Sequence, residues 1–127
     1  MVDITPLLPA DRQLIQGYGE GIFRIAGIEY AHPVFVRETE TRPWNIHSVD
    51  DIQLPEELVS ESGVRVLLIG TGDSIAPIPA EIRTSLKQAG IGVEIMDTGA
   101  ACRTFNVLLS EERSVAALLI PPGQAAA

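Results

Sequence analysis

The chain has 127 residues, of which 46% are hydrophobic and 5% aromatic, and its formal net charge at pH 7 is -8. This length fits one domain whose core is built mainly from aliphatic side chains. The acidic surplus repels phosphate backbones and anionic lipid headgroups, so the composition argues against a nucleic-acid partner. The single cysteine, Cys102, excludes an intramolecular disulfide and favours a reducing compartment.

The first residues carry no recognisable targeting signal. They lack the basic and apolar regions of a secretory signal and the Arg-rich bias of a mitochondrial presequence. No stretch reaches the roughly 18 apolar residues that a transmembrane helix needs. We therefore expect a cytoplasmic bacterial protein that reaches the inner membrane only through a partner.

The N-terminal half is expected to contain short strands. Residues 1–16 are interpreted as an irregular lead-in to a compact core over residues 17–120. Branched and aromatic residues predict one strand over 22–28 and another over 32–36, with a turn near Gly27 or Ala31. Residues 44–46 are a plausible third strand. Proline followed by two glutamates predicts a short helix over 55–59.

The C-terminal half alternates strands with helices. Apolar runs predict buried strands over residues 64–69, 91–96 and 115–120. A helix is predicted from Pro79 to the glycine at position 90. A second helix is expected to begin after Thr98, which would be its N-cap. Its core-facing residues would be Ala101, Phe105, Leu108 and Leu109. This alternation predicts one α/β domain over 1–127, with a frayed tail at 121–127 and a strand order that the sequence leaves open.

A glycine loop follows the first of these buried strands, where α/β folds place ligand loops. The loop is Gly70-Thr71-Gly72-Asp73. It lacks the Gly-Lys-Ser/Thr of a phosphate-binding loop, and Asp73 would repel a phosphate, so it does not match a dinucleotide fingerprint. A structural turn is the favoured interpretation, and a binding loop is the alternative.

Cys102 also has two interpretations. Near the first turn of its helix the dipole would favour a thiolate, with Arg103 next to it in sequence. Buried cysteine, however, is common and behaves as a small hydrophobe. The inert thiol is favoured, and no Cys–His pair is predicted because His32 and His47 are remote in sequence.

Three further features favour structural interpretations. The group of His47, Asp50 and Asp51 matches no established metal-ligand spacing, so we expect no metal site and no cofactor. Trp44 is a candidate interface residue, although burial in the core is the commoner fate of tryptophan. Arg103 and Arg113 are either ordinary surface charges or a basic pair near the glycine loop.

Several segments, taken in order, carry a family resemblance. They are Gly21–Gly27 with Tyr30, Trp44, Leu68–Gly72, Gly90–Thr98, Ala100–Asn106 and Leu109–Ala117. Over roughly residues 17–120 the chain resembles a small α/β family, described as a domain of unknown function, that includes mitochondrial complex I assembly factor 3. Phe105 stands where relatives often have tyrosine, which argues against an essential phenol at that position.

The resemblance implies a three-layer α/β domain, with a central mixed β-sheet flanked by helices and an extra N-terminal β layer. It also implies an accessory role with a protein partner, without catalytic residues or a cofactor. Its motif residues are expected to meet at one edge of the sheet. Asp73 of the glycine loop is added to these motif residues. The candidate binding residues are then Gly70, Thr71, Gly72, Asp73, Met96, Asp97, Thr98, Cys102, Arg103, Thr104 and Asn106.

These observations leave three hypotheses. The first is a non-catalytic factor that docks on a partner, such as a respiratory-complex subunit. The second is a small-molecule-binding protein or enzyme with a pocket near Gly70–Asp73 and Cys102–Asn106. The third is a homo-oligomer whose motif residues build the fold.

Overall fold

The computed structural model describes residues 8–60 and 63–123, and within them it contains two β-sheets and three α-helices. The strands are β1 (Ile15–Gly19), β2 (Ile22–Ile25), β3 (Ile28–Tyr30), β4 (Val34–Val36), β5 (Thr41–Pro43), β6 (Val66–Gly70), β7 (Gly92–Met96) and β8 (Val115–Leu119). The helices are α1 (Glu56–Val59), α2 (Ala80–Gln88) and α3 (Thr98–Ser110), with a 3-10 turn at Val49–Asp51. In the described residues no helix has the length and apolar content that crossing a membrane requires.

The small sheet is an antiparallel meander of β1, β2 and β3. The predicted strand over 22–28 is two strands, and they turn at Ala26 and Gly27, whose φ angles are 49° and 84°. The prediction that residues 1–16 are irregular was wrong at its C-terminal end, because residues 15 and 16 belong to strand β1. Gly17 and Gly19 give β1 a weak local signal, and its pairing with β2 supplies what local propensity does not.

The large sheet is mixed and has the order β5-β4-β8-β6-β7. Strand β6 runs parallel to β7 and β8, whereas β4 is antiparallel to both β8 and β5. The continuous apolar runs of β6 and β8 occupy the middle of this sheet, where both faces are covered. The predicted mixed central sheet is confirmed.

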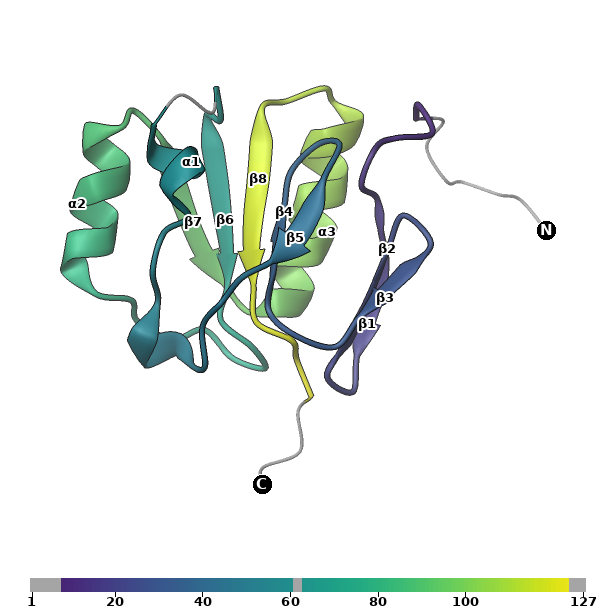
Figure 1. Cartoon of the computed structure of the whole chain (residues 1–127), viewed down its shortest axis with the longest axis horizontal. Coiled ribbons are helices and arrows are strands. Elements are labelled where there is room, and N and C mark those ends of the chain that lie inside the picture. Colours follow the sequence, from purple (N-terminus) through teal and green to yellow (C-terminus); the bar gives the residue numbers. More distant parts are fainter. Residues whose placement is uncertain (1–7, 61–62, 124–127) are drawn as a thin grey trace.

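Each face of the large sheet has its own hydrophobic core. On one face, Phe105 and Cys102 of α3 pack with Phe23 and Ile25 of β2. On the other face, Leu58 of α1 and Leu86 of α2 pack with residues of the segment that follows β5, including Trp44. In Figure 1, α3 lies between the large sheet and the β1–β3 sheet, and α1 and α2 lie on the other side. The predicted three-layer arrangement with an extra N-terminal β layer is confirmed.

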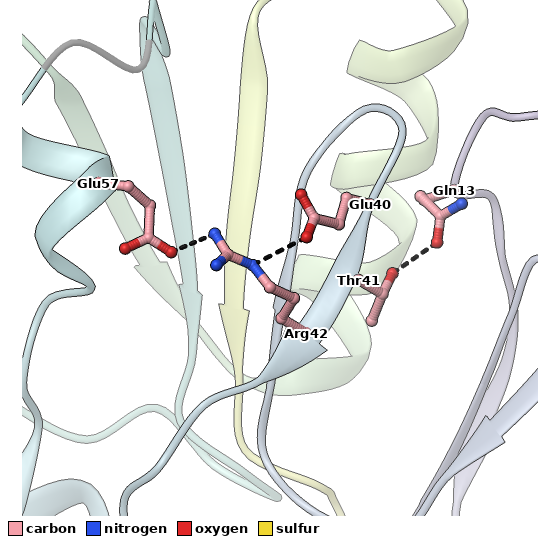
Figure 2. Close-up of polar contacts among 5 residues, drawn as sticks. All are labelled: Gln13, Glu40, Thr41, Arg42 and Glu57. Atoms are coloured by element: carbon pink, nitrogen blue, oxygen red, sulfur yellow. Dashed lines mark hydrogen bonds and ion pairs between the residues drawn. The ribbon is translucent and has the colours of Figure 1, made fainter.

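The third predicted strand is displaced along the chain. Strand β5 ends at Pro43, so the prediction of a strand over 44–46 was wrong. Trp44 and Ile46 belong to the hydrophobic core that contains Leu58 and Leu86, which explains why apolar residues stand here outside a strand. Trp44 also donates from Nε1 to the carbonyl of Gln53 at 2.8 Å. Polar side-chain contacts help to hold the short strand β5 in place. Figure 2 shows Arg42 between Glu40 and Glu57, while Thr41 donates to Gln13 at 2.7 Å on the other side.

Two terminal details also differ from the predictions. Asp97, rather than Thr98, caps α3, because its Oδ1 accepts from the Ala100 amide at 2.9 Å. Part of the predicted frayed tail is packed, since Pro121 and Pro122 are buried and Pro122 accepts from the Gly21 amide at 2.8 Å. Residues 124–127 lie outside the described part of the chain.

Candidate functional site

Thr98 joins the glycine loop, the start of α3 and the C-terminal segment. Its hydroxyl accepts from the Gly72 amide at 2.8 Å and donates to the Ile120 carbonyl at 2.7 Å. Its own amide donates to the Gly72 carbonyl at 2.9 Å. The side chain is completely buried. The hydroxyl of Thr98 therefore satisfies two backbone groups from segments that are distant in sequence.

Gly70 lies directly against this threonine. A Cβ atom at position 70 would lie 2.9 Å from both Cα and Oγ1 of Thr98 and 3.0 Å from Cδ2 of Leu119. One of these neighbours is a backbone atom, which cannot rotate away. The close approach of β6 to α3 therefore explains the glycine at this position.

The rest of the glycine loop is held by its own hydrogen bonds. Thr71 donates from its amide to Met96 at 3.0 Å, and its hydroxyl donates to the Ser74 carbonyl at 2.8 Å. The same hydroxyl accepts from the Ala76 amide at 3.0 Å. Asp73 accepts from the Gly123 amide at 2.7 Å. These contacts make the loop a structured turn, as the favoured interpretation of its sequence holds.

Two residues of α3 attach the small sheet. Asn106 accepts from the Ile15 amide at 2.9 Å and donates to the Ile15 carbonyl at 2.8 Å, as a neighbouring strand would. Arg103 donates to the Tyr18 hydroxyl, and the Tyr18 ring packs 3.1 Å from the position of a Cβ on Gly99. Both side chains thus connect α3 to β1.

Arg103 and Arg113 do not form a basic pair. Arg103 lies in the second turn of α3, whereas Arg113 follows the end of this helix and its amide donates to Leu108. The part of α3 from Arg103 to its last residue, Ser110, is about 10 Å long. Each arginine is therefore a separate surface charge.

Cys102 lies in the core between α3 and the sheets, and its exposed fraction is 1%. Burial raises the pKa of its thiol from 9.0 to about 12, against the smaller lowering effect of Arg103. The thiol is therefore protonated at neutral pH and unsuited to nucleophilic attack. This environment agrees with the inert interpretation and gives the pocket hypothesis no reactive thiol.

The remaining candidate residues lie in different surroundings. Met96, at the end of β7, is partly buried and packs against the first core, and Thr104 is partly buried on α3. The structure brings Gly70–Gly72, Met96, Asp97 and Thr98 together at one edge of the sheet. On α3, Arg103 and Asn106 contact β1, whereas Cys102 lies in the hydrophobic core. Trp44 lies on the opposite face of the sheet with 5% of its surface exposed, and its part in an interface remains a prediction.

The group around His47 is a capping motif. Asp51 accepts from the Ser48 amide at 2.8 Å and from the His47 amide at 3.1 Å, and these bonds, that of Ser48 first, lower the pKa of its carboxyl. Ser48 caps the same 3-10 turn in a reciprocal capping box. Within residues 8–60 and 63–123 no three His, Cys, Asp or Glu side chains are placed to hold a metal ion.

A hollow of about 370 Å³ lies beside β7, and none of its residues was a candidate binding residue in the sequence analysis. It is lined by Ile75, Ala76, Pro77, Arg83, Val93, Glu94 and Ile95. Ile75 has 66% of its surface exposed, the largest fraction among the exposed large hydrophobic residues of the described chain. Sequence periodicity could not show this, since Ile75 belongs to a loop and its exposure depends on how that loop folds.

Comparisons with known proteins agree with this fold. The chain is 39% identical to an uncharacterised protein of Rhodobacter capsulatus, over 86% of either chain. It is 37% identical to NADH dehydrogenase [ubiquinone] 1 alpha subcomplex assembly factor 3 of Xenopus tropicalis, covering 89% of this chain but only 63% of that relative. A crystal structure described as an outer membrane protein from Bartonella henselae superposes with a TM-score of 0.79, at 37% identity, over 89% of this chain and 98% of the other.

A family match spans nearly the whole described domain. Residues 15–120 match the family described as Protein of unknown function (DUF498/DUF598). These residues include both sheets and all three helices. The chain therefore belongs to the DUF498/DUF598 family.

Proposed function

We propose that this chain is a non-catalytic accessory factor that binds another protein during assembly of a respiratory complex. The observation that carries the proposal is its 37% identity, over 89% of its length, to a protein named as an assembly factor of NADH dehydrogenase. A binding surface shared with that relative would give this chain a related role.

The use of the family's motif residues supports the same proposal. The hydroxyls of Thr71 and Thr98 and the amide of Asn106 all bind backbone groups of the chain itself. The thiol of Cys102 lies in the core. These motif residues therefore stabilise the fold and leave none of their own groups free for catalysis. A protein that binds a partner through its surface needs a stable fold but no catalytic centre.

We further propose that the partner is a protein subunit at the cytoplasmic side of a bacterial membrane. The net charge of -8 favours a partner with a basic surface, since complementary charges raise the rate of association. The same charge opposes direct binding to anionic lipid headgroups.

Affinity purification of the tagged chain from its own organism, in a mild detergent, tests this function. We expect subunits of a respiratory complex to co-purify reproducibly, and to do so less at high salt because charge complementarity contributes to the contact. Cells that express the tag alone serve as the control for non-specific capture. Recovery of the chain without any reproducible partner would contradict the proposal.

A further inference from the structure

The two edges of the large sheet are built very differently. At one edge, β5 has only three residues and ends in Pro43, which has no amide hydrogen to donate. Arg42 is paired with Glu40 and Glu57, and Thr41 is bonded to Gln13 (Figure 2). Short length, proline and charged side chains are features that prevent an edge strand from pairing with another chain.

The opposite edge strand is longer and contains no proline, and Glu94 is its one charged residue. Strand β7 has five residues without proline, and β6 is its one neighbour in the sheet among residues 8–60 and 63–123. The amide of Gly92 donates to Arg65 at 2.9 Å, and the carbonyl of Met96 accepts from Thr71 at 3.0 Å. In a parallel pair, alternate residues bond the same neighbour. Positions 92, 94 and 96 therefore face β6, and the amide and carbonyl groups of Val93 and Ile95 face outward.

The hollow of about 370 Å³ runs along this outward edge, since three consecutive residues of β7 line it. Its apolar part is formed by Val93 and Ile95, which are partly buried, and by Ile75, which is largely exposed. Unpaired strand groups beside exposed aliphatic side chains are the features that a strand-addition site requires.

Two charged residues line the hollow, Arg83 of α2 and Glu94 of β7. Glu94 lies on the edge strand itself, and its charge favours a different polypeptide over a second copy of the chain. Only an antiparallel pair of two β7 strands centred on Glu94 would satisfy the outward groups of both Val93 and Ile95. That pair places the two Glu94 carboxylates directly opposite each other, which is destabilising. Each copy also carries a net charge of -8. A strand with a lysine or arginine opposite Glu94 avoids both repulsions.

We propose that the β7 edge binds an extended segment of another protein by strand addition. The segment places apolar side chains against Ile75, Val93 and Ile95, and a lysine or arginine opposite Glu94. This inference rests on the proposed function, because it assumes that the chain has a protein partner, and it adds where and by what chemistry the partner binds.

Photo-crosslinking in cells of the source organism tests the inference. Benzoylphenylalanine replaces Ile75, in the hollow, or Val107, which has a similar exposed fraction of 55% but does not line it. We expect an adduct with another protein from position 75 and at least tenfold less from position 107. Glu94→Lys should abolish the adduct, whereas Glu29→Lys, the same charge change on β3, should leave it.

Mass spectrometry of the adduct then identifies the attached segment. We expect alternating apolar residues with a central lysine or arginine, and a synthetic peptide of that segment should protect the Val93 and Ile95 amides from hydrogen exchange. An adduct with a second copy, equal adducts from both positions, insensitivity to Glu94→Lys, or protection at other amides would each overturn the inference. If affinity purification recovers a partner but position 75 gives no adduct, the edge is wrong and the proposed function stands. If no partner is recovered, both fall.

Discussion

At the scale of single residues, Thr98 connects three segments through one hydroxyl. Thr98→Val keeps the shape of the side chain but leaves the Gly72 amide and the Ile120 carbonyl without their partner. Each unsatisfied buried group costs about 1–3 kcal/mol. We expect the free energy of unfolding to fall by roughly 2 kcal/mol or more in urea titrations. Thr104→Val, on the same helix, is the matched control, and equal effects of the two changes would contradict the account.

Gly70 gives a second test of the same contact. Gly70→Ala places a methyl group 2.9 Å from the Thr98 backbone, so β6 and α3 must move apart. Overpacking of this kind costs about 1–3 kcal/mol. Gly17→Ala in β1, where no atom lies within 4 Å of the added methyl, should change stability far less. Thermal unfolding of the two variants makes the comparison, and an unaffected Gly70→Ala would show that β6 and α3 separate freely.

Cys102 links stability to alkaline pH. Its pKa is raised to about 12 in the folded chain, from 9.0 as the ordinary value. Above pH 9 the unfolded chain loses the thiol proton first, so ionisation favours unfolding. The contribution of the neutral thiol is thus complete below pH 9 and lost as pH rises towards about 12.

The comparison of wild type with Cys102→Ala isolates this effect from other alkaline titrations. We expect the stability difference between them to be constant from pH 6 to about 8.5 and to shift in favour of the alanine variant above that. Native Cys102 should also resist a small alkylating reagent at neutral pH until urea unfolds the chain. Rapid labelling of the native protein would contradict the buried, protonated thiol.

At the scale of elements, Asn106 attaches the β1–β3 sheet to α3. Asn106→Ala removes both bonds to Ile15, and Asn106→Asp retains only the acceptor. We expect faster hydrogen exchange at the β1 and β2 amides in the alanine variant and an intermediate rate in the aspartate variant. The amides of β6 and β8 should change little, because they belong to the other sheet. Uniform acceleration across both sheets would show that the small sheet does not open separately.

The elements that sequence predicted well are those with strong local patterns. Residues 64–69 and 115–120 are continuous apolar runs, which central strands require, and they became β6 and β8. Strand β1 was missed because its glycines have a low strand propensity. It forms through its pairing with β2 and its hydrogen bonds to Asn106, which the local sequence does not show. Asp97 and Thr98 are both capping residues, so sequence alone could not show which one caps α3 and which one joins distant segments.

The candidate site was predictable only in part. The position of Gly70–Gly72 next to the start of α3 follows from where parallel strands end. The hydrogen bonds of Thr98 do not, since they depend on segments more than twenty residues away. The outward groups of β7 were equally hidden, because a strand's place at the edge depends on the order of the sheet.

At the scale of the whole molecule, the two edges of the large sheet differ in how well they are protected from pairing with another chain. The small sheet and α3 cover one face of the large sheet, as Figure 1 shows. Polar side-chain contacts occupy the β5 edge, as Figure 2 shows. Strand β7 forms the remaining edge, with no completely buried residue along it. A scaffold with one unprotected edge fits a factor that binds another protein.

Deletion of the gene, followed by native gels of detergent-solubilised membranes, tests the central claim of an assembly role most directly. We expect less fully assembled respiratory NADH dehydrogenase, accumulation of a smaller intermediate, and recovery with the wild-type chain but not with Glu94→Lys. An unchanged amount of the assembled complex in the deletion strain would contradict it.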